Sequence, residues 1–288
     1  MVTTLVKLIG AVWRAINDFL GKNGPQLSAA ISYYTLFSLF PLIVAIISGL
    51  SFLLGQESID ELANRVAQQS PVSEETISEI ITSAVNSRNI AGIVGILGLL
   101  WAGTAVFGSI RKGINATWGI TRPRPFLKER LVDITFMVAA AILMLISIFS
   151  TAILTYLMEI LEFITRETYV DGALLWERLA SALPPTLSFI VFFAIYWLLP
   201  NTKVKITEPL PGAIVATTGF EILKNVFVWF IGNSSIYSTI YGSVGSIVVL
   251  LVWVYVSSII LLFGSTITSR FSQYSLVKEK EIEDIVKL

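Results

Sequence analysis

Residues 225–269 read NVFVWFIGNSSIYSTIYGSVGSIVVLLVWVYVSSIILLFGSTITS and contain no Asp, Glu, Lys or Arg. One helical crossing of a bilayer core needs roughly 20 apolar residues, so this stretch is long enough for two crossings joined by a turn. Four more uncharged stretches precede it, at residues 23–56, 89–110, 134–158 and 179–202. The sequence therefore predicts an all-α, polytopic membrane protein that forms a bundle of six transmembrane helices.

The boundaries of these stretches predict one integral membrane domain that covers residues 1–288. Residues 1–22 are predicted to form an amphipathic helix at the membrane interface, because apolar residues such as Val12 and Phe19 recur at helical spacing opposite Arg14. A cytoplasmic tail is predicted at the other end of the chain. The predicted crossings and the tail lie at residues 29–54, 90–109, 132–158, 179–199, 210–231, 241–269 and 270–288.

Lys and Arg are distributed unequally between the predicted loops. One side of the membrane holds three in the N-terminal segment, six in the connector 111–130, two in the turn 200–207 and four in the tail. The loops on the other side, residues 56–88 and 159–178, hold two each. Because cytoplasmic loops carry an excess of Lys and Arg, we expect both termini to lie in the cytoplasm.

Small residues recur on one face of the second predicted crossing. Small side chains let membrane helices approach closely, since packing rather than hydrophobicity drives their association. We expect this face to be the most tightly packed seam of the protein, and a substrate groove on the same face is the alternative. Its members, at alternating steps of four and three, are Ala91, Gly95, Gly98, Ala102, Ala105 and Ser109.

Composition excludes several kinds of chemistry. The chain has no Cys and no His, its net charge is zero, and 55% of its residues are hydrophobic. It therefore lacks thiolate and imidazole metal ligands and the commonest general base, and it contains no phosphate-binding glycine loop or hydrolase motif. We predict no catalytic residues, no metal and no cofactor. Without a basic field, we predict no nucleic-acid partner either.

Glu221 and Lys224 are charged residues inside the fifth predicted crossing. Glu221 lies ten residues after Pro211, which is about 15 Å along a helix and near the predicted membrane midplane. Charges inside a membrane are costly and mark either a substrate pathway or a buried pair, and the i, i+3 spacing lets these two side chains meet. The sequence leaves open whether the pair binds substrate or is structural.

Other polar residues are candidates for the same binding site. Asn225 follows Lys224, and Tyr33, Tyr34 and Ser38 lie on the first crossing. The alternative is that these groups bond to their own backbone or to a neighbouring helix, as polar side chains in membrane helices often do.

A basic cluster follows the second crossing. Its charge suits the head groups of anionic lipids, and the alternative is that it only fixes the topology. Its members are Arg111, Lys112, Arg122, Arg124, Lys128 and Arg130.

Three stretches follow one another along the chain: SAAISYYTLFSLFP at 28–41, the segment from Trp101 through RKGIN at 111–115 to RPF at 124–126, and the segment with Phe220-Glu221, Lys224, Tyr241-Gly242 and Gly264. In this order they resemble the YihY/BrkB family of six-helix inner-membrane proteins. One departure is that the family often has Gly-Ala-Glu near the end of the last helix, where this chain has Gly264-Ser265-Thr266.

The resemblance implies a location in the inner membrane of a bacterial-type cell. The family has long carried the label ribonuclease BN, which is generally regarded as a misassignment, and some members are suspected of transporting lipids or lipopolysaccharide precursors. We therefore expect a transporter or flippase of an amphipathic or anionic substrate, such as a lipid, and not an enzyme. The alternative is a membrane scaffold that organises lipids or partner proteins. Membrane lipids are the expected partners, and a homo-oligomer is left open.

Overall fold

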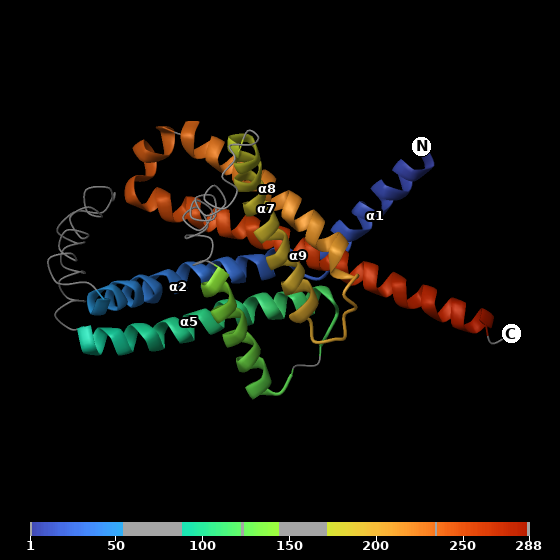
Figure 1. The fold of residues 1–288 in the computed structure, drawn as a ribbon, viewed down its shortest axis with the longest axis horizontal. Helices are drawn as coiled ribbons and strands as arrows, with labels where there is room; N and C mark the ends of the chain where they lie inside the picture. Colours follow the sequence, from blue (N-terminus) through green and yellow to red (C-terminus); the bar gives the residue numbers. More distant parts are fainter. Residues whose placement is uncertain (1, 54–87, 122–123, 144–171, 234, 287–288) are drawn as a thin grey trace, which may run out of the picture. The chain divides into compact units, whose positions relative to one another are not determined.

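The computed structural model describes residues 2–53, 88–121, 124–143, 172–233 and 235–286. These residues form helices joined by turns, and no strand occurs among them, so the all-α prediction is confirmed. Residues 126–143 form one of the helices. The others are α1 Val2–Gly21, α2 Gly24–Leu53, α5 Arg88–Thr117, α7 Gly172–Leu198, α8 Pro209–Asn233 and α9 Ser235–Val286 (Figure 1).

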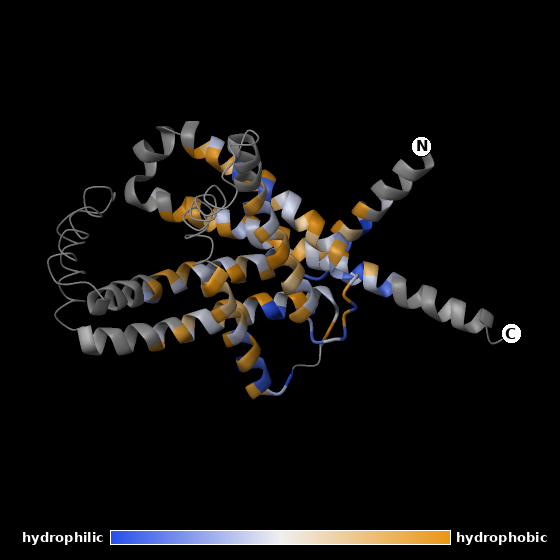
Figure 2. Ribbon diagram, in the orientation of Figure 1, coloured by the Kyte–Doolittle hydropathy of each residue, from blue (hydrophilic) through white to orange (hydrophobic). Residues whose placement is uncertain are grey.

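Two helical stretches in the described part of the chain are long and apolar enough to cross a membrane. They are Pro209–Ile231 on α8 and Ile247–Tyr274 on α9, with mean hydropathies of 1.5 and 2.7. Only 6% and 17% of their most apolar windows are buried, whereas the core helix of a soluble protein would be mostly buried. A shorter apolar helix, Ala182–Leu198, lies on α7, and Figure 2 shows apolar residues along these helices.

Two helices extend beyond the crossings that the sequence predicts. The second crossing is predicted to end at residue 109, but α5 continues to Thr117, and α7 begins at Gly172 rather than at 179. The helices are longer than the predicted crossings because a charged residue ends an apolar stretch without ending a helix, and Leu, Ala, Glu and Arg all favour helices. The bounds of the crossings themselves stay predictions. The outer loops and residues 144–158 of the third crossing lie outside the described residues.

The chain ends α5 with a Schellman motif. The Ile120 N–H donates to the Asn115 carbonyl at 2.9 Å, and the Gly119 N–H donates to the Ala116 carbonyl at 3.0 Å. Gly119 has a φ of 70°, which a residue with a Cβ rarely adopts. The backbone therefore explains why α5 stops here and not at Arg111, where only a charge appears.

The described helices group into two compact units. The first unit consists of Met1–Gly24, Ile114–Ile222 and Ile260–Leu288, and the second of Pro25–Gly113 and Leu223–Ile259. Helices α5, α8 and α9 each contribute residues to both units. The single-domain assignment and the six-crossing topology stay predictions.

The core of the first unit forms where α8 and α9 approach each other closely. A Cβ on Gly264 would collide with the Tyr196 hydroxyl and would lie 2.9 Å from the Ala216 Cβ and 3.0 Å from the Gly212 carbonyl oxygen. Tyr196 is fully buried, and its hydroxyl donates to the Leu261 carbonyl at 2.8 Å. The helices pack backbone against backbone here, which only small residues allow.

The turn between α7 and α8 is joined to the segment after α5 by polar contacts. Arg124 donates to the Pro200 carbonyl and to the Asn201 side-chain oxygen, both at 2.8 Å. The Asn201 N–H donates to the Asn115 side-chain oxygen at 2.8 Å. Glu208, which is buried, accepts the Lys205 N–H at 3.0 Å just before α8 begins. These bonds satisfy backbone groups that the non-helical turn would otherwise leave unpaired.

In the second unit, α2 packs against α5. A Cβ on Gly98 would lie 3.4 Å from the Pro41 Cβ, an ordinary contact distance, and Ala102 is buried. The small-residue face of α5 is thus partly buried, but in the described part of the chain the contact of α8 and α9 at Gly264 is closer. The prediction that α5 carries the tightest seam is wrong for these residues, because four-step and three-step spacing identifies a face and not its partner.

We expect Gly264→Ala to destabilise the protein far more than Gly98→Ala. The added methyl at position 264 has no room, and overpacking typically costs about 1–3 kcal/mol. At position 98 the methyl meets only Pro41, and Ala favours a helix over Gly by about 1 kcal/mol. Thermal unfolding in detergent measures both effects, and equal melting temperatures for the two variants would contradict the close approach.

Candidate functional site

A polar contact joins α7 and α8 between the fourth and fifth predicted crossings. The Ser188 hydroxyl lies 3.4 Å from a Glu221 carboxylate oxygen, and both residues are half-buried. This distance is long for a hydrogen bond. Phe192 and Phe220 pack edge to face beside it, with ring centroids 5.9 Å apart. Glu221 lies near the middle of the apolar stretch Pro209–Ile231, so the contact lies far from either end of the span.

Two prolines on α7 precede Ser188 by about one turn. Pro184 and Pro185 lack backbone N–H donors, which would weaken a helix interior. The hydroxyls of Thr186 and Ser188 bond to the carbonyls of Ala182 and Pro184, at 2.7 and 3.0 Å. The helix continues through the prolines to Leu198, and the Ser188 hydroxyl has two alternative acceptors, Pro184 and Glu221.

The remaining residues of the predicted binding site lie in the second unit. Lys224 is half-buried and Asn225 is exposed, both on α8. Tyr33 and Tyr34 are exposed on α2, with their rings 5.5 Å apart. Ser38 donates to the Thr35 carbonyl at 2.7 Å, which is the backbone bond that the sequence left as the alternative. A role of these residues in binding stays a prediction.

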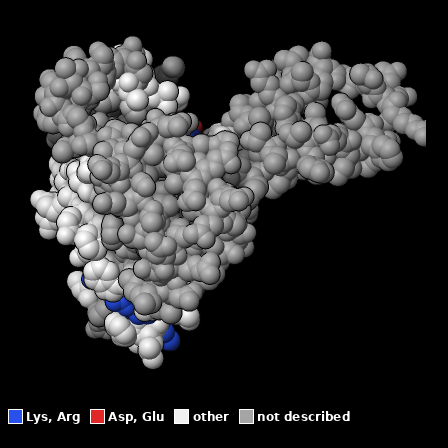
Figure 3. Space-filling model, turned by 90° about the vertical axis from the view of Figure 1, so that its left-hand side faces the viewer, with Lys and Arg blue, Asp and Glu red and all other residues white. Residues whose placement is uncertain are grey.

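The basic cluster divides into buried and exposed members. Arg111 is only 4% exposed on α5, and Arg124 is occupied with the turn between α7 and α8. Lys112, Lys128 and Arg130 are exposed, whereas Arg122 lies outside the described residues. Figure 3 shows Lys and Arg side chains gathered at the lower end of one face. The exposed members are the ones whose positions allow contact with lipid head groups.

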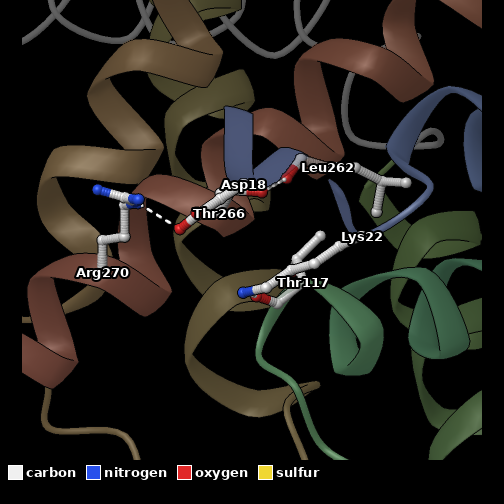
Figure 4. Close-up of polar contacts among 6 residues, drawn as sticks. All are labelled: Asp18, Lys22, Thr117, Leu262, Thr266 and Arg270. Atoms are coloured by element: carbon white, nitrogen blue, oxygen red, sulfur yellow. Dashed lines mark hydrogen bonds and ion pairs between the residues drawn. The ribbon is translucent and has the colours of Figure 1, made fainter. Parts of the chain in front are cut away.

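A second polar site forms where α1 packs against α9. Arg270 donates its Nε–H to an Asp18 carboxylate oxygen at 2.5 Å, and the two side chains are 32% and 37% exposed. The apolar contact beside this pair is between the rings of Phe19 and Phe263, 6.0 Å apart and perpendicular. Ala15 and Phe19 are buried on the face of α1 that also carries Asp18. Asp18 therefore points toward Arg270 on α9 (Figure 4).

This packing differs from the face that the sequence predicts for α1. Phe19 is buried as protein core, while Val12, Leu20 and Trp13 are exposed. The amphipathic pattern is correct as a helix signal, but its apolar residues divide between a protein contact and an exposed surface.

Lys22 lies beside the ion pair and donates a hydrogen bond to a backbone carbonyl at the end of α5. Its ammonium donates to the Thr117 carbonyl at 2.5 Å, one of the helix-terminal carbonyls that have no intrahelical partner. The Thr117 hydroxyl lies 2.7 Å from the Ser265 hydroxyl on α9. Thr266 is buried and donates to the Leu262 carbonyl. Figure 4 shows Lys22, Thr117 and Thr266 around the same junction.

The charges at this junction change the pKa of two groups. The pKa of Asp18 lies below its ordinary value because Arg270 donates a hydrogen bond to the carboxylate and attracts it. The pKa of Lys22 is also lowered, first because burial disfavours the charged ammonium and further because Arg270 repels it. Asp18 opposes this shift. The carboxylate therefore stays ionised while two cations compete for it.

The sequence did not point to the Asp18–Arg270 pair. Its only signal is that Arg270 is the first charge after the uncharged stretch 225–269 and that Asp18 interrupts an amphipathic helix. Ser188 was likewise missed, because a serine on an apolar helix is more often bonded to its own backbone.

Comparison with known proteins supplies independent information. Residues 15–284 match the protein family described as virulence factor BrkB. YfkH of Bacillus subtilis (strain 168), whose name describes it as ribonuclease-like, is 28% identical over 91% of this chain and 93% of its own length. No solved structure matches the chain significantly.

Two further relatives carry the name UPF0761 membrane protein. The one from Actinobacillus pleuropneumoniae serotype 5b (strain L20) is 29% identical over 96% of both chains. PSHAa0171 of Pseudoalteromonas translucida (strain TAC 125) is 31% identical over 94% of this chain and 87% of its own. These matches confirm the family resemblance that the three sequence stretches indicated.

The Asp18–Arg270 pair predicts a stability that depends on pH. Because the pKa of Asp18 is lowered in the folded state, the pair stabilises the fold above the ordinary value of 3.8 and loses this effect as the pH falls further. Solvent screens side chains that are a third exposed, so we expect less than about 1 kcal/mol. The melting temperature of the wild type relative to Asp18→Asn should decrease between about pH 5 and pH 3. A difference that does not change with pH would show that the pair adds no stability.

Proposed function

This chain belongs to the virulence factor BrkB family, and we propose that it is an integral membrane protein that transports or flips an amphipathic anionic substrate. Two findings support the membrane location: relatives across nearly the whole chain are named membrane proteins, and two apolar helical stretches are mostly unburied. In this proposal six helices cross the inner membrane and both termini face the cytoplasm, as the Lys and Arg distribution predicts.

The observation that carries the transport proposal is the mid-span contact of Ser188 and Glu221. A carboxylate in the hydrocarbon region is costly and is usually retained for a pathway or a proton relay. The neighbouring contact of Phe192 and Phe220 already packs α7 against α8, so the polar contact is not needed to join these helices.

The proposed route uses positive charge to attract the substrate. The exposed Lys112, Lys128 and Arg130 gather anionic head groups on the cytoplasmic side. Lys224, one helical turn after Glu221 on α8, offers a cation to the head group at mid-depth. From the i, i+3 spacing in the sequence, we expect Glu221 to balance this cation when no substrate is present.

A second candidate function is a membrane scaffold that does not transport. It is favoured by the start of the helix 126–143, where Phe126 and Leu127 are exposed next to the exposed Lys128 and Arg130. Apolar and basic side chains side by side are typical of a surface that inserts into anionic lipid. In this case Glu221 would be structural.

We expect reporter fusions to confirm the orientation. Fusions after Trp118, Thr202 and Arg270 should be active only as cytoplasmic reporters, and a fusion after Ile231 should be active only on the outer side. The Lys and Arg asymmetry is the reason. An outer-side signal at Trp118 would reverse the topology and the proposed direction of substrate entry.

We expect Glu221→Gln and Lys224→Met to stop transport. In proteoliposomes, wild-type protein should move fluorescent phosphatidylglycerol between leaflets faster than protein-free vesicles do. Each single variant should abolish this acceleration and should also lower stability, because removing one charge leaves the other without its counter-ion inside the apolar span. The double variant should recover stability but not transport. Thr218→Val, which changes an exposed hydroxyl bonded to its own helix, is the control.

Two outcomes would count against this function. If wild-type vesicles are no faster than protein-free vesicles, the scaffold is favoured. If the double variant recovers the transport rate together with stability, Glu221 and Lys224 are only a structural pair.

A further inference from the structure

A cavity of about 700 Å³ opens in the first unit between α1, α8 and α9. Its size falls in the range of pockets that hold small organic ligands, about 300–1,000 Å³. Five apolar residues line it: Val12, Ala15, Val215, Ile267 and Phe271. Several of them, Val12 and Phe271 among them, are exposed, so a ligand can reach this wall from outside the protein.

The polar part of the wall has an excess of positive charge. It consists of Arg14, Asp18, Arg270, Gln273 and Tyr274, which gives two guanidinium groups and one carboxylate. Asp18 takes the Nε–H of Arg270, but a guanidinium has five N–H donors. The terminal NH₂ groups of Arg270 are therefore outside the Asp18 contact. A guanidinium fork is suited to phosphate, which it binds by two parallel hydrogen bonds.

We propose that this cavity binds an anionic amphiphile through its phosphate head group, with Arg14 and Arg270 as the anion ligands, and that Asp18 occupies Arg270 until the head group displaces it. The inference rests on the proposed function, because it names the substrate class and the place of uptake. The apolar wall distinguishes the ligand from free phosphate, since only an amphiphile gains from covering Val215 and Phe271.

Asp18 gives the site a built-in competitor. Without ligand, the two arginines would place two positive charges in a cavity where they are only partly hydrated. The Asp18 carboxylate offsets this positive charge while the cavity is empty. Ligand binding then exchanges one anion at Arg270 for another. The affinity for the ligand therefore depends on how much more strongly Arg270 binds the head group than it binds Asp18. Removal of the Asp18 charge should strengthen ligand binding rather than weaken it.

The location fits uptake from the cytoplasmic leaflet. α1 and the end of α9 lie at the N-terminal and C-terminal ends of the chain, and the proposed topology puts both in the cytoplasm. Tyr274 is exposed at the rim, where an aromatic ring with a polar tip suits the boundary between head groups and hydrocarbon.

The test is binding of fluorescent phosphatidic acid to the full-length protein in neutral detergent, with a phosphatidylcholine analogue of the same chains as the uncharged comparison. Asp18→Asn should bind several-fold more tightly than wild type. Arg14→Gln and Arg270→Gln should each bind at least about tenfold more weakly, the effect of one lost charge-assisted hydrogen bond. Inorganic phosphate should compete only at far higher concentration than the lipid.

Two control variants change charge outside the cavity. Glu129→Gln removes an acid and Lys203→Gln removes an exposed cation, and neither residue lines the cavity. Both should bind phosphatidic acid as wild type does. Melting curves identify any variant that has not folded, and if Arg270→Gln fails to fold, Asp18→Asn and Arg14→Gln still decide the result.

Several outcomes would overturn the inference. The first is that Asp18→Asn binds phosphatidic acid as wild type does, and the second is that Arg14→Gln and Lys203→Gln lose affinity for it equally. The others are that the phosphatidylcholine analogue binds as tightly as phosphatidic acid, or that free phosphate competes as well as the lipid.

Failure of transport is a separate result. If phosphatidic acid binds as described but proteoliposomes show no lipid movement, the cavity stands and the proposed transport function does not.

Discussion

The close approach of α8 and α9 at Gly264 is the contact on which the first unit depends. With no room for a Cβ at Gly264, the two helices meet at their backbones, and the rotation and height of α9 are fixed. The same segment of α9 then presents Phe263 to Phe19, Ser265 to Thr117 and Arg270 to Asp18. Since lipid provides little hydrophobic force between helices, such packing is what determines the register. The site at α1 is thus a consequence of a glycine contact on another helix.

Polar groups in this unit are used in two different ways. Near the ends of the helices, hydrogen bonds such as those of Lys22 and Arg124 complete the termini of α5 and the turn after α7, where a helix cannot satisfy its own carbonyls. At mid-span, Ser188 and Glu221 complete no terminus. Polar groups that complete no helix terminus are the better candidates for function. The second arginine of the cavity, which the single aspartate does not balance, is such a group.

The sequence predicts the helices well and their partners poorly. The described residues of the uncharged stretches are mostly helical, and α1 was predicted from its amphipathic pattern. The resemblance to the family is confirmed over residues 15–284. Charge defines where the second predicted crossing ends but not where α5 ends, because Gly119 is the residue that stops the helix. The Asp18–Arg270 pair joins residues 252 positions apart, and periodicity defines the face of a helix without defining what covers it. The cavity depends on that partnership and was therefore not predictable.

The natural absence of cysteine allows the register of α9 to be measured directly in membranes. In the double variant Phe19→Cys with Phe263→Cys, a short thiol-specific cross-linker should join the two positions, because their rings are in contact. Phe19→Cys with Tyr274→Cys, three turns further along α9, should not be joined, and adding Gly264→Leu should abolish the first cross-link. Equal cross-linking of Phe19→Cys to both positions, or a first cross-link that survives Gly264→Leu, would contradict the account in which the glycine contact sets the site.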